Sequence, residues 1–440
     1  MNFMGYLHIL YYLHQLQKNQ WLTLPELEKL QHKKLKAIVR HAYQNVKFYH
    51  KMFDRWGIKP REIKTKEDLT KLPLITKSDI TNSFPNDIVA NNIDMERCHN
   101  SRTSGSTAEP LTSIFDEKSW DFAKYAVKMR ARLACGLNVG DRMICIEASR
   151  NDLLQREEKK LGFRIGNLFL KRKYLSVFND IQDHLPVLTG FRPDAIYGFP
   201  SYFKLLAQLV QEKEINSIRP KMFFTSGELL DKATRKAINS VFEAELFDIY
   251  GNTEVKEVAW ECGEHAGYHI NMDSVVVEFI RDGEPVSEGE RGQIVITSLH
   301  NYAMPLLRYT VGDVGVPTDD PCSCGRGLPL MKVLEGRLID FVVLPSRVVS
   351  PYLLTDILEG IPGIVRYQIV QEKKDKIMVQ FIPVKSFSKQ IICRQIIEQY
   401  QKALGEDIDI KPIIVDALPR DRSGKFRVVI SKVSSNQLSF

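Results

Sequence analysis

Apolar and polar positions alternate along the chain with two different periods. From residue 1 to about 95 the apolar positions recur at helical spacing, most clearly from Leu24 to Phe53. From about 96 to 335, short apolar runs alternate with helical patterns and end near Gly, Ser or Pro. Examples of such runs are residues 143–146, 195–198 and 222–226. This alternation predicts βα units on a mixed sheet, and therefore an α/β fold.

Two later parts of the chain depart from that alternation. The runs 275–280 and 292–297, separated by a segment with Asp282-Gly283, predict antiparallel strands and suggest a smaller barrel-like subdomain. From about residue 341 the pattern predicts a strand, a helix, two strands, a second helix and a final strand. This order is typical of a compact α+β unit that folds beside the main body.

Composition fits a globular enzyme. The chain of 440 residues is long enough for a large core and more than one domain, and 44% hydrophobic with 26% charged residues is ordinary. The 61 basic and 54 acidic residues give a net charge of +7, spread along the chain. This weak excess favours small anionic ligands, and we expect no nucleic-acid partner.

Neither a membrane span nor a secretion signal is expected. The segment Met4 to Tyr12 is apolar but short, and His8 and the following Gln15 are polar, so we expect an amphipathic helix packed on the body. Seven cysteines without a secretory signal favour a reducing compartment over a disulfide framework. The cytoplasm is therefore the expected location.

A short loop rich in hydroxyl groups stands between two predicted structured segments. It reads Thr103-Ser104-Gly105-Ser106-Thr107-Ala108-Glu109-Pro110. Hydroxyl and backbone N–H groups can converge on a phosphate there, and only a residue without a Cβ lets the backbone come that close. A flexible surface loop has a similar composition, so the loop alone does not separate the two interpretations.

Four further motifs follow this loop in a fixed order. They are DIYGNTE at 248–254, RYTVGD at 308–313, GRLID at 336–340 and PRDRSGK at 419–425. With these motifs the chain resembles the adenylate-forming superfamily, and within it the CapK-type branch of the phenylacetate-CoA ligase family. The resemblance also includes residues 35–46 and 68–77, and so covers nearly the whole chain.

The resemblance implies two domains. Residues 1–338 would form an N-terminal ATP- and acyl-binding domain, with a helical segment at 1–95 and a zinc-bearing subdomain at about 255–335. Residues 339–440 would form a mobile C-terminal domain that carries a catalytic lysine. A hinge beside the Gly-Arg motif would join the two domains.

The resemblance also implies roles for individual residues around ATP. Thr253 would lie near the α-phosphate, and Glu254 would hold Mg²⁺, a hard cation suited to carboxylate and phosphate oxygens. Lys425 would stabilise charge on the α-phosphate when the C-terminal domain closes, whereas its charged surroundings alone indicate a solvated turn. The remaining nucleotide contacts would be Thr103, Ser104, Gly105, Ser106 and Thr107 at the β- and γ-phosphates, Tyr250 on the adenine face with Gly251 and Asn252 beside it, Asp313 and Arg337 near the ribose, and Ser226, Gly227 and Glu228 in a second turn. A helix N-cap followed by Glu is the alternative for residues 225–228.

Four positions depart from the family pattern. Ala108 stands where the family usually has Gly, Leu111 where many superfamily members place a basic residue, and Thr310 replaces a common arginine. Charge neutralisation at the phosphates must then depend on Mg²⁺ and backbone donors. Ile339 stands where the hinge usually carries a polar residue, so the adenylation residues match better than the machinery for the CoA step.

A second group of residues contains sulfur. Cys262, His265 and His269 precede Cys322 and Cys324, and a folded subdomain could bring them together as a tetrahedral Cys₃His site. Cysteines one residue apart do not easily bridge each other, and thiols grouped with His in a cytosolic chain favour a metal over free thiols. A structural Zn²⁺ is the expected ion. His269 is the preferred fourth ligand by resemblance to zinc-bearing relatives, and His265, at Cys-x-x-His spacing, is the alternative.

Together these residues predict an ATP- and Mg²⁺-dependent ligase. It would activate a small-molecule carboxylic acid as its adenylate, release pyrophosphate, and pass the acyl group to CoA or to the thiol of an acyl carrier protein. Two alternatives stay open: a ligase-like nucleotidyltransferase that adenylylates a hydroxyl or amine, and a zinc-stabilised scaffold without catalysis. Relatives in the family suggest a homodimer. The acid is not specified, because the aromatic residues that could form an aryl-acid pocket are more often core at such spacing: Tyr197, Phe199, Tyr202 and Phe224.

Overall fold

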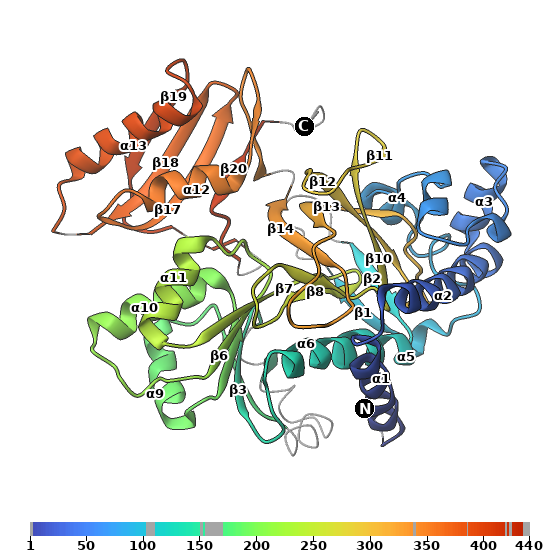
Figure 1. The fold of residues 1–440 in the computed structure, drawn as a ribbon. Coiled ribbons are helices and arrows are strands. Elements are labelled where there is room, and N and C mark those ends of the chain that lie inside the picture. The colour runs from blue at the N-terminus through green and yellow to red at the C-terminus, as the bar shows by residue number, and fades with distance from the viewer. Residues whose placement is uncertain are drawn as a thin grey trace.

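The chain forms a large N-terminal body and a smaller C-terminal lobe (Figure 1). The computed structural model describes residues 3–102, 111–149, 153–154, 170–337, 340–384, 386–418, 420–421 and 425–433. The lobe follows the end of strand β14 (Leu330–Arg337). The predicted domain boundary at 338/339 lies outside the described residues and stays a prediction.

Helices make up the first part of the chain, as the helical spacing predicts. The longest, α2, begins where the Thr23 N–H donates to the Glu26 carboxylate at 2.9 Å, which satisfies a backbone group that the helix itself leaves unpaired. Its buried face, which includes Leu35 and Ile38, packs into the apolar core of the body. The described helices here are α1 (Phe3–Asn19), α2 (Leu24–Asn45), α3 (Lys47–Arg55) and α4 (Lys77–Ser83), with 3₁₀ turns at Pro60–Glu62, Glu67–Lys71 and Met95–Arg97.

The expected amphipathic helix at the N-terminus is α1. Leu16 is only 1% exposed, and it joins an apolar cluster with Phe115 and Phe122. These partners come from β2 (Thr112–Phe115), which pairs with β1 (His99–Arg102), and from the helical segment that follows it. That segment runs through α5 (Glu117–Trp120), a π-helical stretch at Asp121–Val127 and α6 (Lys128–Ala134).

One sheet of twelve strands forms the centre of the body. Its order is β11-β10-β12-β13-β14-β9-β8-β7-β6-β5-β3-β4. The strands are β3 (Arg142–Glu147), β4 (Lys171–Ser176), β5 (Ala195–Gly198), β6 (Met222–Thr225), β7 (Glu245–Asn252), β8 (Lys256–Glu261), β9 (Tyr268–Ile270), β10 (Val275–Arg281), β11 (Glu284–Pro285), β12 (Gly292–Ser298), β13 (Tyr309–Thr318) and β14. Strands β4, β3, β5, β6 and β7 pair in parallel, which confirms the predicted βα units.

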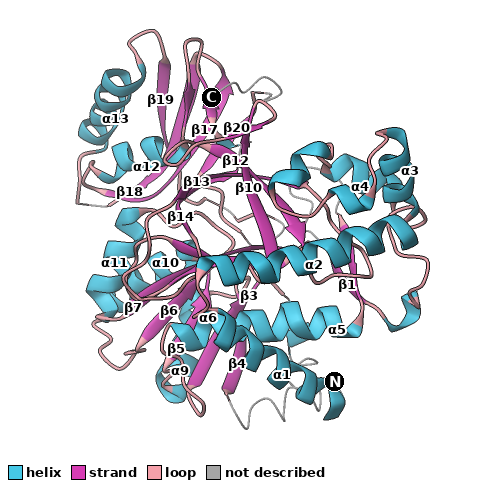
Figure 2. Cartoon of the chain, turned by 45° about the vertical axis from the view of Figure 1, so that its right-hand side comes forward, coloured by secondary structure: helices cyan, strands magenta, loops and turns pink. Residues whose placement is uncertain are grey.

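Helices cover both faces of the parallel strands (Figure 2). Alternate residues of β3 show this, because Met143 joins the apolar cluster of α6 whereas Ile144 joins the cluster of the helices that connect the strands. Burial on both faces explains why these strands read as continuous apolar runs instead of alternating ones. The connecting helices are α9 (Ile181–Phe191), α10 (Pro200–Glu212) and α11 (Lys232–Phe242).

The expected barrel-like subdomain is wrong, because the antiparallel strands continue the same open sheet. Strand β7 has eight residues, enough for two partners. Its first half pairs in parallel with β6, from Glu245 to Asp248, and its second half pairs in antiparallel register with β8, from Ile249 to Asn252. The predicted antiparallel pairing of 275–280 with 292–297 is confirmed in β10 and β12.

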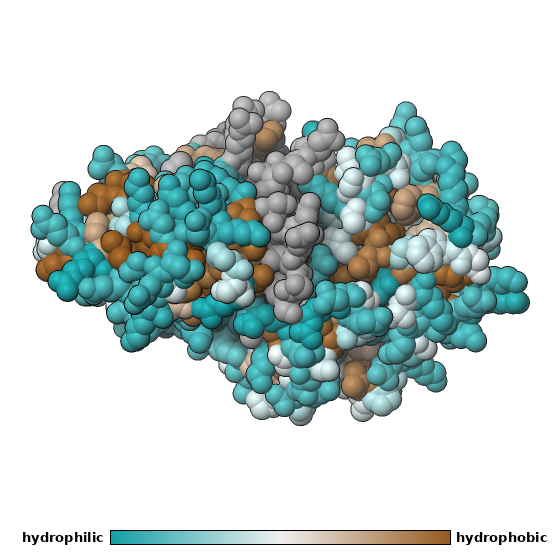
Figure 3. All heavy atoms as spheres, turned by 90° about the horizontal axis from the view of Figure 1, so that it is seen from above, coloured by the Kyte–Doolittle hydropathy of each residue, from teal (hydrophilic) through white to brown (hydrophobic). Residues whose placement is uncertain are grey.

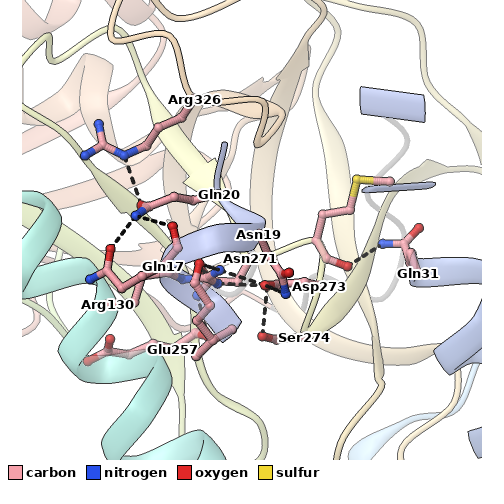
Figure 4. A network of polar contacts seen from close by, with 12 residues as sticks. Gln17, Asn19, Gln20, Gln31, Arg130, Glu257, Asn271, Asp273, Ser274 and Arg326 are labelled. Atoms are coloured by element: carbon pink, nitrogen blue, oxygen red, sulfur yellow. Dashed lines mark hydrogen bonds and ion pairs between the residues drawn. The ribbon is translucent and has the colours of Figure 1, made fainter. Parts of the chain in front are cut away.

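A buried ion pair joins α1, α6 and the turn before β10 (Figure 4). Arg130 donates to both carboxylate oxygens of Asp273, at 2.8 and 2.9 Å, and to the Asn271 side-chain oxygen at 2.6 Å. The Asn19 amide donates to the same Asp273 carboxylate at 3.0 Å. Because the side chains of Arg130 and Asp273 are fully buried, each charge depends on the other for solvation.

The C-terminal lobe is an α+β unit, as predicted, with two strands more than the pattern indicated, one before α12 and one, β19, after α13. Its sheet has the order β19-β18-β17-β20, and α12 and α13 pack into its apolar core. The unpredicted strand β19 contains Pro412, and it lies at the sheet edge, where a residue without an N–H is tolerated. The elements are β15 (Val342–Val343), β16 (Val348–Val349), α12 (Pro351–Glu359), β17 (Ile364–Lys373), β18 (Lys376–Pro383), α13 (Lys389–Leu404), β19 (Asp409–Ile414) and β20 (Val429–Ser431).

Seen from above, both parts of the molecule show apolar residues scattered among polar ones (Figure 3). Within the described ranges, no helix has the length and apolar character needed to cross a membrane.

Candidate active site

The predicted site residues gather where β7 changes partners from β6 to β8. Ligands of such sheets bind beyond the carboxyl ends of the parallel strands, at a point where the strand order or direction changes. Strands β5 and β6 end at Gly198 and Thr225, and the Ser226 N–H donates to the Gly198 carbonyl at 3.2 Å. The β7–β8 turn and the turn after β6 therefore face the same end of the sheet.

Gly251 makes the tight β7–β8 turn possible. A Cβ on this residue would lie 2.6 Å from the Lys256 carbonyl oxygen and 3.0 Å from the Glu257 Cα. The Asn252 side-chain oxygen accepts a hydrogen bond from the Val255 N–H at 2.8 Å and closes the turn. The turn holds Thr253 and Glu254 at the end of the sheet.

Two phenol groups hold the two carboxylates that the motifs single out. The Tyr250 hydroxyl donates to Asp313 at 2.8 Å, and the Tyr309 hydroxyl donates to Glu254 at 3.1 Å. Glu254 is buried. The structure therefore brings Tyr250, Glu254 and Asp313 together from β7, the β7–β8 turn and β13.

The turn after β6 meets the predicted catalytic lysine from the other lobe. Gly227 has φ +82°, and a Cβ there would lie 3.3 Å from Cε and 3.4 Å from Nζ of Lys425. The alternative of a helix N-cap at residues 225–228 is wrong. Helix α11 begins later, and its N-cap is Asp231, whose carboxylate accepts from the Thr234 N–H at 2.6 Å.

Glu228 connects the two lobes. One carboxylate oxygen accepts from the Phe426 N–H at 2.6 Å and from Arg420 at 3.4 Å, and the other accepts from the Ser201 N–H at 3.0 Å. Arg420 also donates to the Ser201 hydroxyl at 2.8 Å. Through these contacts, Phe426 and Arg420 of the lobe fix the loop of Lys425 on the N-terminal body. The sequence did not reveal this role of Glu228.

Some predicted residues lie outside the described part of the chain. Thr103, Ser104, Gly105, Ser106 and Thr107 are among them, as are Ala108 and Ile339. For Arg337 the backbone is described, and it pairs with Asp313 in the β13–β14 register.

Two of the positions that depart from the family pattern have structural roles. Leu111 is 1% exposed and belongs to the core. The Thr310 hydroxyl donates to the Ile75 carbonyl at 3.2 Å. Both side chains are therefore engaged in packing or backbone pairing.

Lys256 is a residue that sequence reasoning missed. Its ammonium donates to the Thr253 carbonyl at 2.8 Å and to the Ser101 hydroxyl, two residues before the predicted phosphate loop. Burial, followed by the nearby charge of Lys124, lowers the pKa of Lys256 to about 7. Its φ of +69° is rare for a residue with a Cβ, and no motif in the sequence singles out this lysine.

The sulfur-containing residues form one compact cluster. The ligand atoms of Cys262, His269, Cys322 and Cys324 all lie within 4.8 Å of one another. The Cys262 and Cys322 sulfurs are 3.6 Å apart, and Nε2 of His269 is 3.3 Å from the Cys324 sulfur. Ligands at 2.0–2.3 Å from a tetrahedral zinc are separated by roughly 3.3–3.8 Å, so this donor set fits that ion.

The two candidate histidines have different surroundings. Burial lowers the pKa of His269 to about 4, which keeps its imidazole neutral as metal binding requires. Its other ring nitrogen lies 3.3 Å from the Leu328 carbonyl. His265 points elsewhere and pairs with Glu245 at 3.0 Å and with Glu261 at 3.7 Å. The structure therefore groups His269, and not His265, with the three cysteines.

Comparison with known proteins gives the family. A phenylacetate-coenzyme A ligase of Thermus thermophilus is 30% identical over 365 residues, which are 80% of this chain and 80% of that protein. The chain belongs to the phenylacetate-coenzyme A ligase family. Within this family, residues 345–432 match the profile described as the CapK C-terminal domain. Protein CapK of Staphylococcus aureus is 21% identical over 93% of this chain and 90% of that protein.

Several solved structures have the same fold as this chain. A 2-hydroxyisobutyryl-CoA ligase in the postadenylation state, in complex with R3-HIB-AMP, matches with a TM-score of 0.81 at 21% identity, over 94% of this chain and 91% of that chain. The same enzyme in the thioesterification state matches with a TM-score of 0.65. The predicted α/β fold and the predicted class, an adenylate-forming CoA ligase, are confirmed.

Proposed function

We propose that this ligase activates its carboxylic acid at the turns around Thr253 and Gly227, with Lys425 as the residue that stabilises the transition state. The observation that carries this proposal is the position of Lys425 beside Gly227, because the two residues come from different lobes. The acid carboxylate attacks the α-phosphorus of ATP, the bond to the bridging oxygen breaks, and pyrophosphate leaves with the electron pair. A lysine beside the α-phosphate stabilises the charge that develops in this step.

The carboxylates of the site have separate tasks in this proposal. Asp313, oriented by Tyr250, accepts hydrogen bonds from the ribose hydroxyls, and Glu254, oriented by Tyr309, would hold Mg²⁺ on the phosphates. A buried carboxylate with a fixed orientation suits a hard cation, and Mg²⁺ would supply neutralisation of phosphate charge. Thr253 contributes at the α-phosphate, next to the Lys256 contact that fixes its carbonyl.

The second half-reaction requires Lys425 to leave. A thiol then attacks the acyl carbon, the bond to the phosphate oxygen breaks, and AMP departs. The higher similarity to the postadenylation structure than to the thioesterification structure supports assigning the present arrangement to the first half-reaction. CoA is the acceptor that the family implies, and a carrier-protein thiol stays a further prediction, as do a homodimer and a cytoplasmic location.

We assign a structural zinc to Cys262, His269, Cys322 and Cys324. Four protein ligands would complete its coordination and leave no position for a substrate, so its contribution would be to stability. Metal analysis of the purified protein should give one zinc per chain, reduced to near zero in Cys324→Ser and unchanged in His265→Gln. Zinc lost in His265→Gln and kept in Cys324→Ser would contradict the assignment.

Acid-dependent exchange of labelled pyrophosphate into ATP tests the proposed activity. The expected result is exchange that depends on one class of acid, and AMP as the released product. An AMP adduct of a hydroxyl or amine would indicate a nucleotidyltransferase instead. The absence of both ATP binding and exchange in folded protein would favour a scaffold.

A further inference from the structure

Two cations lie one helical turn apart at the carboxyl end of β5. Lys128 and Arg132 stand at positions i and i+4 of α6 and therefore share one face of that helix. The Lys128 ammonium is 4.8 Å from the centre of the Tyr197 ring, and the Arg132 guanidinium carbon is 5.1 Å from it. Both cations therefore pack against one aromatic ring at the end of a parallel strand.

These cations have incomplete polar contacts. Arg132 is 3% exposed, and its Nη1 donates to the Lys128 carbonyl at 3.0 Å and to Glu257 at 3.4 Å, whereas its Nη2 has no hydrogen-bond partner among the residues that the structure describes. Lys128 is half-buried, and its ammonium makes no hydrogen bond or ion pair with the residues that the structure describes. A buried cation with unused donors is unfavourable unless an anion or hydrogen-bond acceptor completes its shell.

The cluster lies close to the proposed adenylation site. Glu257 follows Glu254 by three residues along the β7–β8 turn and strand β8. Tyr197 precedes Gly198, whose carbonyl accepts the Ser226 N–H at 3.2 Å. The two cations and the turns that carry Thr253 and Gly227 therefore lie at the same end of the parallel strands.

We propose that the acid substrate carries a second anionic group, such as a second carboxylate, which Lys128 and Arg132 bind. The inference rests on the proposed adenylation function, and it gives the substrate class of that same site. Burial, followed by the Arg132 charge, lowers the pKa of Lys128, and the charges of Glu147 and Glu257 act against that shift. Glu257 pairs with Nη1 of Arg132 at 3.4 Å and leaves Nη2 of Arg132 without a partner among the described residues.

A purely apolar acid is a poor match for this cluster. It would remove water from both cations and offer no acceptor in return, which carries a large penalty in a buried site. The aromatic residues considered for an aryl-acid pocket agree with this. Phe224 is fully buried in the core, Tyr202 hydrogen-bonds His184 at 2.7 Å, and Tyr197 lies against the two cations.

The test compares acids of matched skeleton in pyrophosphate exchange. The pairs are hexanoate with adipate, and phenylacetate with 4-carboxyphenylacetate. The wild type should favour the dicarboxylic member of at least one pair. Lys128→Met should lower kcat/KM for that diacid by about 10- to 100-fold, which corresponds to the loss of one hydrogen bond to a charged group. The kcat/KM for the monoacid should stay unchanged or rise. Lys128→Arg should restore most of the diacid activity, and Lys118→Met, which removes an exposed lysine of α5 in the same helical segment, serves as the control.

Failure of this inference can be told from failure of the proposed function. Exchange with monoacids only, or an equal loss with both acids in Lys128→Met, would overturn the second anionic group and leave adenylation standing. No exchange with any acid, in protein that stays folded, would overturn both.

Discussion

At the residue scale, the site depends on side chains that fix other side chains. Tyr250 orients Asp313, Tyr309 orients Glu254, and Lys256 ties Thr253 to Ser101. Preorganised groups need not reorient as charge develops in the transition state, which is a main source of catalytic power. We therefore expect conservative changes in the supporting residues to slow adenylation without abolishing ATP binding.

Gly251→Ala should damage the β7–β8 turn, where the proposed site residues Thr253 and Glu254 lie. The added methyl would meet the Lys256 carbonyl at 2.6 Å, and the backbone that carries Thr253 and Glu254 must then shift. We expect a loss of about 1–3 kcal/mol of stability and a larger loss of pyrophosphate exchange. Gly190→Ala is the matched control, since a Cβ at Gly190 meets nothing within 4 Å. Equal exchange rates in the two variants would contradict this account of the turn.

Asp248 should make stability depend on pH. Burial, followed by the Glu261 charge, raises the pKa of Asp248 to about 6. Between pH 4 and 6 the unfolded chain loses this proton while the folded chain keeps it, so rising pH removes stability, by roughly 3 kcal/mol in total. Asp248→Asn should therefore gain stability relative to the wild type as pH rises from 4 to 7, measured by urea unfolding. A difference that is the same at both pH values would refute this.

Motifs in the sequence single out residues that the structure brings together, whereas residues whose surroundings depend on contacts between distant elements carry no such motif. Tyr250, Glu254 and Asp313 stand in recognisable motifs, and the structure brings them together. Glu228 and Lys128 acquire their surroundings only when the lobe docks or when α6 meets β5. No local pattern encodes such long-range contacts.

At the element scale, β7 determines the architecture of the body. Its two halves pair with β6 and β8, so the parallel and antiparallel strands form one sheet, and the turn at its end carries the proposed site. Strands β3, β5 and β6 could be predicted from continuous apolar runs, because both faces of the sheet are buried at these strands. The strand pattern did not reveal that the parallel and antiparallel strands form one sheet, since the periodicity of a strand does not specify which strand it pairs with.

The buried pair of Arg130 and Asp273 should be essential for packing α1 and α6 on the sheet. Arg130→Leu leaves the Asp273 carboxylate buried without its cation, which should cost about 3–5 kcal/mol. Arg394→Leu removes an exposed pair with Glu398 on α13 and should leave the unfolding midpoint unchanged. Similar midpoints for the two variants in urea unfolding would show that the buried pair has no such role.

At the scale of the whole molecule, polar contacts between the two lobes include those of Glu228 and a hydrogen bond from the Gln208 side chain to the Val365 carbonyl at 3.2 Å. Such a polar junction suits an enzyme whose lobes must separate between two half-reactions. Arg420→Gln should weaken the docked arrangement, because it removes the charge opposite Glu228 and alters the contact with Ser201.

This variant should lose adenylation more than thioester formation. In single turnovers we expect a slower formation of acyl-adenylate and a nearly unchanged rate from preformed acyl-adenylate and CoA. Arg394→Gln, in the same lobe and away from the junction, should affect neither rate. A variant that slowed only the second step would contradict the assignment of the docked state to adenylation.

The most direct test of the central claim compares the wild type with Lys425→Ala in pyrophosphate exchange, beside Lys432→Ala as an exposed lysine of the same lobe. Our account predicts that Lys425→Ala loses at least about 100-fold of the exchange rate at saturating substrates while its Kd for ATP changes little, because the contact forms mainly in the transition state. Lys432→Ala should resemble the wild type. Exchange at the wild-type rate in Lys425→Ala would contradict the role of this lysine and the proposed site with it.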